Sequence, residues 1–392
     1  PEAIAPHHAR VLMARAPWLG RLGPWLAIGT SPAAIMTGGG GGELLAGPEL
    51  VAALMAGVGV LVALAAAMGV LGQRCGTSMI GVLSEPLGHR AGRPVAAVVR
   101  LAMMIGWCGV NVGVAGDATG RLLGLPQGGG VAAFGAVALL IAARGLRALS
   151  WSALAAGLAT PARAVSGLTL ALEDREVSLS SPLLGVESGG AGMVVALLVG
   201  YGAAFALRTP DFTRDLARPS HVVWCAALGL AAPLAAFALA GAALQSATGS
   251  WNLAEVLLEL GAPTLAYLFL SVGFLGSVLT NLHSGALSLT EVRRGAPHGA
   301  GLVAVAVAGG VLAAVGFAEA MLEYLALMAV VAPAAIVLAW LHRWRRRGGR
   351  PGRPGAGLAA WGAGVAAGVG LDVASSSVAL PVAILVTAVV FW

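Results

Sequence analysis

The sequence predicts an all-α integral membrane protein with about twelve transmembrane helices. Of its 392 residues, 58% are hydrophobic and only 10% are charged, and the mean hydropathy is +0.88. Soluble domains contain roughly 25% charged residues, so this composition argues against a water-soluble fold. Apolar runs near or above the roughly 20 residues needed to cross a bilayer recur along the whole chain. We therefore expect the membrane part to make up most of the protein.

The individual spans follow from apolar runs that are bounded by arginine, proline or acidic clusters. Each run is long enough to be a helix, and the connections between runs hold most of the charged residues. The twelve predicted spans begin near Trp25, Leu50, Val98, Val131, Leu149, Gly192, His221, Pro263, Gly301, Leu322, Leu358 and Ser376.

The distribution of arginine across alternate loops supports this count and gives an orientation. With the N-terminus inside, twenty of the 23 basic residues, from Arg10 to Arg353, fall in inner loops. Outer loops hold only Arg121 and Arg175, and Arg163 falls inside the fifth span. Because cytoplasmic loops are enriched in basic residues, the pattern predicts a protein of the cytoplasmic (inner) membrane with both termini in the cytoplasm.

Composition and motifs also narrow the class of function. The net charge of +6 comes from arginines scattered through short loops, so we expect no nucleic-acid partner. We find no HExxH, GxSxG, P-loop or acidic pair, which argues against an enzyme and against a bound cofactor. A channel would need a continuous polar file, and a receptor or sensor remains an alternative that composition does not remove. Membrane lipids are the expected partners of the basic loop at residues 343–357.

Two glycine-rich places interrupt spans one and six. Thr37 is followed by five glycines, Gly38 to Gly42, and Gly200-Tyr201-Gly202 lies in the middle of the sixth span. Each glycine destabilises a helix by about 1 kcal/mol relative to alanine, and unwound backbone in a membrane survives only where it lines a cavity or is buried in protein. Breaks at matching places in two five-span sets favour an inverted-repeat transporter with its site near the midplane. The alternative is that these glycines only allow close helix packing.

Five short strings between residues 25 and 295 carry a resemblance to a known family. They are Thr37-Gly38-Gly39, Gly72 to Ser78, Gly106 to Val110, Pro210 to Arg214, and Leu282 to Ala286. Together they resemble the nucleobase:cation symporter family, and most closely its cytosine permease and hydroxymethylpyrimidine transporter branches. The resemblance implies a LeuT-type core of two inverted five-helix repeats, at residues 25–172 and 190–342. Two additional C-terminal helices follow at residues 358–392, and residues 1–24 form a cytoplasmic segment.

The resemblance implies import of a nucleobase or a related flat heterocycle, and it indicates which residues hold the ring. Trp107 matches the family's stacking tryptophan, and Asn111 lies one turn later on the same helix face, where its amide can donate and accept. The opposite face of the ring is expected from Tyr201 or Phe205, with Asn281 as a further contact. Backbone at Gly38, Gly39 and Gly200 would complete the edge contacts, an arrangement that suits a neutral base.

The resemblance further implies coupling to Na⁺ or H⁺. The expected cation ligands are the carbonyls of Ala33 and Met36 and the hydroxyls of Ser277 and Thr280. The two hydroxyl residues are three positions apart rather than adjacent, which weakens the case for sodium. Glu43 and His283 are the candidates for proton coupling, because ionisable groups within spans are rare and often functional.

Overall fold

The structure is a computed structural model that describes residues 17–88, 91–173, 175, 177, 190–293, 295–349, 355–371 and 377–392. Most of the predicted cytoplasmic segment 1–24 lies outside these residues, as do Arg10, Arg353 and the predicted span start Ser376. Within the described residues every regular element is a helix. The predicted all-α class is therefore confirmed.

The first half of the chain forms a 3₁₀ turn and seven helices. Each of the first five predicted span starts falls inside one of these helices. The elements are η2 (Trp18–Arg21), α1 (Leu22–Gly29), α2 (Pro32–Leu44), α3 (Gly47–Cys75), α4 (Met79–Leu87), α5 (Gly92–Leu123), α6 (Gln127–Ala143) and α7 (Leu146–Leu172).

The second half is built in the same way, with short elements between long ones. The elements are α8 (Gly190–Arg208), α9 (Pro210–Thr213), α10 (Pro219–Trp224), the π-helix η3 (Cys225–Ala231), α11 (Ala232–Thr248), α12 (Leu253–Glu259), α13 (Pro263–Val292), α14 (His298–Ala314), η4 (Phe317–Ala320), α15 (Met321–Arg347), α16 (Ala356–Val369) and α17 (Ala379–Phe391).

The lengths and hydropathy of these helices are those of a multi-pass membrane protein. Among the described residues, six helical segments are long and apolar enough to cross a bilayer, namely α3, α5, α8, α13, α15 and the continuous run from α10 to α11. Four further apolar helices, α6, α14, α16 and α17, are shorter. The count of about twelve spans stays a prediction.

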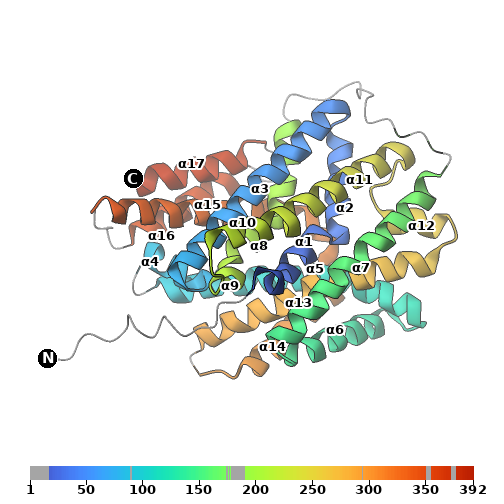
Figure 1. The fold of residues 1–392 in the computed structure, drawn as a ribbon, viewed down its shortest axis with the longest axis horizontal. Helices are drawn as coiled ribbons and strands as arrows, with labels where there is room; N and C mark the ends of the chain where they lie inside the picture. The colour runs from blue at the N-terminus through green and yellow to red at the C-terminus, as the bar shows by residue number, and fades with distance from the viewer. Residues whose placement is uncertain are drawn as a thin grey trace.

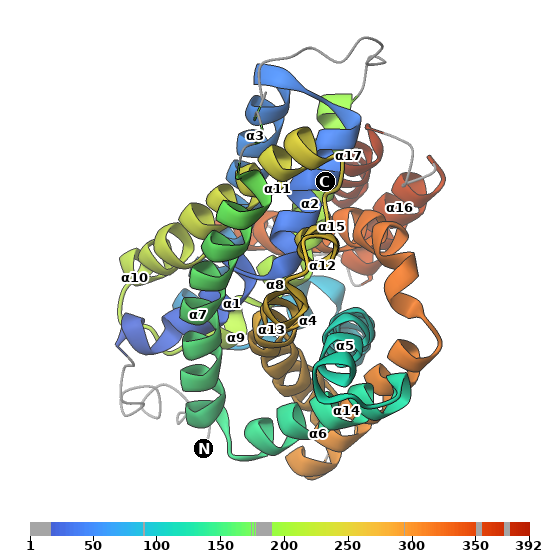
Figure 2. The same ribbon diagram turned by 90° about the vertical axis from the view of Figure 1, so that its right-hand side faces the viewer.

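The long helices surround α1 and α2, which together form the predicted first span. α5 packs along α13, α3 along α8, and α1 and α2 lie among α7, α8, α11 and α13. Figure 1 shows α15, α16 and α17 grouped at one edge of the molecule, and Figure 2 shows α6 and α14 beside α5 on another side. The core between them contains the side chains that form the candidate site.

The first span is broken at Thr30 and Ser31 and not at the glycine run. Ser31 is extended, with φ −66° and ψ 144°, and α2 begins at Pro32. Proline has no N–H to continue the helix, and its ring drives the preceding residue out of the helical region. From Pro32 the helix continues through Thr37 to Gly42 without interruption, so the predicted break there is wrong.

Close packing explains the glycines of α2. A Cβ atom on Gly38 would lie 2.1 Å from the carbonyl oxygen of Ala238 on α11, and one on Gly39 would lie 2.4 Å from Cβ of Trp251. Neither distance leaves room for a methyl group, whereas Gly40 has nothing within 4 Å of such an atom. The glycine run therefore sets how closely α2 approaches α11.

We expect Gly38→Ala to destabilise the protein and Gly40→Ala to be neutral or mildly stabilising. Overpacking a tight contact typically costs about 1–3 kcal/mol, whereas alanine is favoured over glycine within a helix by about 1 kcal/mol. Thermal unfolding of both variants in detergent measures the difference. Equal unfolding temperatures for the two variants would contradict the packing role of Gly38.

The sixth span is also continuous at its predicted break. α8 runs through Gly200 and Gly202, and a Cβ on Gly200 would lie 2.2 Å from the carbonyl oxygen of Leu325 on α15. The helix ends instead at Arg208, and Thr209 connects it to α9, which begins at Pro210. Thr209 keeps helical backbone angles, φ −52° and ψ −30°, so this junction differs from the extended Ser31 of the first span.

Candidate functional site

A small cavity lies where the break of the first span meets α5, α8 and α13. It has a volume of about 20 Å³, enough for about one water molecule, and every residue that lines it is buried. Six of its lining residues were predicted from the sequence as substrate or cation contacts. The lining consists of Ile28, Ser31, Trp107, Asn111, Tyr201, Ala204, Phe205, Arg208, Ser277 and Asn281.

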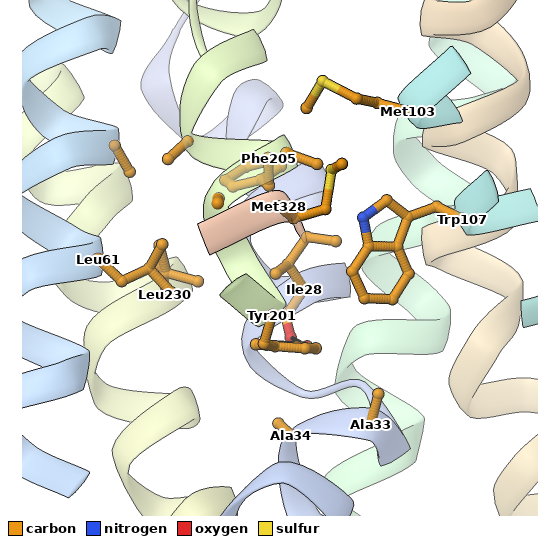
Figure 3. Packing of buried hydrophobic residues seen from close by; sticks show 14 of the residues in the cluster. Ile28, Ala33, Ala34, Leu61, Met103, Trp107, Tyr201, Phe205, Leu230 and Met328 are labelled. Carbon is orange, nitrogen blue, oxygen red and sulfur yellow. Dashed lines mark hydrogen bonds between the residues drawn. The ribbon is translucent and has the colours of Figure 1, made fainter. Parts of the chain in front are cut away.

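Three aromatic side chains form much of the wall. Trp107 projects from α5 towards Tyr201 and Phe205 on α8 (Figure 3). The rings of Trp107 and Tyr201 are 6.2 Å apart and nearly perpendicular, and Tyr324 packs on Trp107 with ring centres 5.5 Å apart. Phe205 is held edge-to-face against Trp25 at 5.1 Å. The cavity therefore offers π surfaces from two helices, and the rings of Trp107 and Tyr201 are nearly perpendicular.

Side chains from α8 and α13 hold the two carbonyls that the break frees. Because Pro32 lacks an N–H, the carbonyl of Ile28 has no helical partner four residues later, and it accepts a hydrogen bond from the Tyr201 hydroxyl. The N–H of Ser31 turns to Ile28, so the carbonyl of Ala27 accepts instead from the Ser277 hydroxyl at 3.0 Å. Tyr201 and Ser277 thus fix the geometry of the break from opposite sides.

Two amides supply neutral polar groups to the cavity. Asn111 is buried in α5 one turn after Trp107, and its Oδ1 has no hydrogen-bond partner. Asn281 is buried in α13, one residue after Thr280. A buried amide oxygen without a partner is unfavourable by about 1–3 kcal/mol, so Asn111 is well placed to accept from a ligand.

Four lining residues were not predicted from the sequence, Ile28, Ser31, Ala204 and Arg208, and Arg208 is the charged one among them. It ends α8 and was predicted to lie in an inner loop, but its side chain is buried with 2% exposure. Its Nη1 donates to the carbonyl of Thr280 at 2.8 Å and to the Ser284 hydroxyl at 3.1 Å. An arginine that directly follows an apolar run is the available signal, because ionisable groups at membrane depth are often functional.

A second arginine assigned to an inner loop is buried beside the site in an ion pair. Nη1 of Arg100 on α5 lies 2.7 Å from a carboxylate oxygen of Asp211 on α9, with side-chain exposures of 1% and 2%. The other oxygen of Asp211 accepts from the backbone N–H of Met79 at 2.9 Å. Asp211 thus joins α9 to α4 and α5.

Three of the four predicted cation ligands have other hydrogen-bond partners in the structure. The carbonyl of Ala33 accepts from the Thr37 hydroxyl at 2.7 Å within α2, and Met36 packs against the hydrophobic core. This follows from the position of the break, because residues after Pro32 are helical and their carbonyls already have partners. The Thr280 hydroxyl donates to the carbonyl of Ser277 and accepts from Nη2 of Arg208 at 3.1 Å.

The remaining predicted residues lie away from the cavity. Gly38, Gly39 and Gly200 face neighbouring helices, as described above. Glu43 is exposed in the last turn of α2, and the His283 ring packs against that of His298 with centres 5.3 Å apart. Neither ionisable group lines the cavity.

No protein-family model matches the chain, and no curated protein matches its sequence. Solved structures do match. Mhp1, a nucleobase-cation-symport-1 family transporter, superposes in a closed conformation with bromovinylhydantoin bound at a TM-score of 0.78 and 17% identity, covering 95% of this chain and 91% of that one. Its inward-facing conformation gives 0.75 at 18% identity, covering 95% and 89%.

Two other transporters share the fold. A Na⁺-coupled sialic acid symporter in an outward-open state gives a TM-score of 0.71 at 10% identity, covering 96% of this chain and 89% of that one. A manganese transporter from Eremococcus coleocola gives 0.60 at 13% identity, covering 100% and 94%. At these identities the likeness concerns the fold, which is the predicted LeuT type.

Proposed function

We propose that the protein is a secondary active transporter that imports a nucleobase or a related flat heterocycle by alternating access, coupled to Na⁺ or H⁺. The observation that carries the proposal is the buried cavity at the break of the first span, lined by Trp107, Asn111, Tyr201 and Phe205. The shared fold with Mhp1, which is described with bromovinylhydantoin bound, supports membership of the nucleobase:cation symporter family.

In this proposal the ring lies against Trp107 and is enclosed from α8 by Tyr201 and Phe205. Flat heteroaromatic rings are held by π surfaces on their faces and by a few oriented polar groups on their edges. Asn111 and Asn281 supply such groups, and each amide can both donate and accept. A cavity that holds about one water molecule is too small for a nucleobase, so binding requires the lining side chains to move apart.

Pockets at the two ends of α5 support alternating access. One, of about 420 Å³, lies near the end of α5 and includes Asp117, Arg121 and Glu255. The other, of about 310 Å³, lies near its start and includes Arg93, Glu85 and His342. The buried cavity lies between these ends, as expected of a site that opens to one side at a time.

The hydrogen bonds of Thr280 and Ser277 on α13 indicate where a coupling cation could bind. Sodium at Thr280 would compete with the guanidinium of Arg208, which donates to both the carbonyl and the hydroxyl of that residue. The oxygens of Thr280 are therefore poor candidates for Na⁺ ligands. Ser277 and the Ala27 carbonyl remain together at the break, where two oxygens are available to a cation.

The proposal places the protein in the cytoplasmic membrane with both termini inside and with repeats at residues 25–172 and 190–342. The arginine distribution along the loops supports this orientation. A LeuT-fold transporter of another small solute is the alternative, and it is supported by the shared fold with the sialic acid symporter.

A stability screen separates these possibilities. Purified protein is heated with cytosine, uracil, adenine, hypoxanthine, allantoin, hydantoins or hydroxymethylpyrimidine, with and without Na⁺. A ligand at about 100 times its Kd stabilises the folded state by ~2.7 kcal/mol, so at least one heterocycle should raise the unfolding temperature. No shift with any heterocycle, together with a shift by sialic acid, would favour the alternative.

A further inference from the structure

Within the part of the chain that the structure describes, the guanidinium of Arg208 has polar partners but no anionic one. Nη1 and Nη2 donate to the carbonyl and hydroxyl of Thr280 and to the hydroxyl of Ser284, all neutral groups. The guanidinium also lies over the rings of Phe205 and Phe212, 5.6 and 5.7 Å from their centres. None of these contacts neutralises the charge.

The one acidic side chain buried nearby is already paired. Among the described residues, Arg208 has no carboxylate within ion-pair distance. Asp211 is close enough to interact with its charge, but its two oxygens bond Arg100 and the N–H of Met79. The charges of Arg100 and Asp211 cancel, so the site keeps the one net positive charge of Arg208. Burying such a charge without a counter-ion is strongly unfavourable.

Two buried polar atoms of the cavity lining lack partners. They are Nε of Arg208, which is a charged donor, and Oδ1 of Asn111, which is an acceptor. A ligand that satisfies both presents an acceptor to Arg208 and an N–H to Asn111. Neutral bases such as uracil and cytosine also carry an acceptor and an N–H, but they leave the charge of the guanidinium without a counter-ion.

Resting on the proposed function, we propose that the preferred substrate is an acidic heterocycle, anionic at neutral pH, whose deprotonated edge or carboxylate faces Arg208. Its charge compensates the guanidinium, and a ring N–H donates to Asn111. Hydrogen bonds between a guanidinium and an anionic oxygen are roughly twice as strong as neutral ones. The site therefore discriminates by charge before it discriminates by ring size.

Matched pairs of compounds test the inference by calorimetry or competition binding at pH 7. Barbiturate and orotate are compared with uracil, and urate with hypoxanthine, because each pair keeps the ring system and changes the charge. We expect the acidic member to bind at least about tenfold more tightly, the range expected for a hydrogen bond to a charged group. Arg208→Gln should reduce this ratio to near one, and Arg208→Lys should keep part of it.

Two further variants keep the test decisive if Arg208→Gln does not fold. Asn111→Asp adds a negative charge to the cavity lining and should weaken barbiturate binding more than uracil binding. Arg147→Gln removes an exposed arginine at the start of α7 and should leave the ratio unchanged, although it alters the net charge equally.

The outcomes distinguish the two proposals. If uracil and hypoxanthine bind as tightly as their acidic partners, and the ratio does not respond to Arg208→Gln or Asn111→Asp, the inference is overturned while the proposed function stands. If no compound of either kind binds to the wild-type protein, the inference and the proposed function are both contradicted.

Discussion

Replacing Trp107 with alanine is expected to weaken heterocycle binding roughly 5- to 150-fold, because stacking of a base on an aromatic side chain contributes about 1–3 kcal/mol. Trp107 is the large π surface that α5 contributes to the cavity, and Asn111 lies one turn away on the same helix. Loss of the indole therefore removes the contact with the face of the substrate ring and leaves the contact of Asn111 with its edge. Binding and uptake are measured in the same preparation of protein.

Two variants show whether the effect belongs to the site. Trp107→Phe keeps a ring and should retain part of the affinity, whereas Trp151→Ala removes an indole that is 62% exposed on α7 and should change nothing. Unchanged binding in a folded Trp107→Ala protein would exclude Trp107 from the substrate site.

Asp211→Asn is expected to destabilise the protein by about 3–5 kcal/mol, because it leaves the buried charge of Arg100 without its partner. Both side chains of this pair are almost completely buried, and they join α5 to α9. The comparison is Asp117→Asn, which breaks an exposed pair with Arg121 and should change the free energy of unfolding by less than about 1 kcal/mol. Denaturation in detergent measures both variants.

Removing both charges should restore part of the lost stability. In the double variant Arg100→Met, Asp211→Leu no unpaired charge remains, and apolar replacements of a buried ion pair are often neutral or better. A double variant less stable than Asp211→Asn alone would contradict the assignment of the destabilisation to an unpaired buried arginine.

Much of the cavity lining could be predicted, because it depends on residue types that are unusual in an apolar span. Trp107, Asn111, Tyr201, Phe205 and Asn281 are aromatic or amide side chains in the middle of spans, and all five line the same cavity. The all-helical membrane fold follows from the apolar runs in the same direct way.

The position of the break could not be predicted from glycine content. Glycine lowers helix propensity, but tertiary contacts decide the outcome, and the run after Thr37 is held helical by its packing against α11. The dipeptide Ser31-Pro32 carries the stronger signal, because proline removes a backbone donor outright. The prediction of Ala33 and Met36 as cation ligands assumes a break at the glycine run, where the structure has a continuous helix.

The burial of Arg100 and Arg208 could not be predicted from the distribution of arginine that predicts the orientation. An arginine at the end of an apolar run counts equally towards an inner loop whether its side chain reaches water or turns back into the protein. Only the packing of α5, α9 and α13 shows that both are buried. The sequence predicts edge contacts without charged side chains, whereas the lining of the cavity includes Arg208.

The most direct measurement of secondary active transport is uptake into proteoliposomes with one gradient imposed at a time. With an inward H⁺ or Na⁺ gradient, a labelled heterocycle that binds in the stability screen should accumulate inside above its external concentration, and dissipating the gradient should abolish the accumulation. Equilibration without accumulation under both gradients would contradict coupled transport.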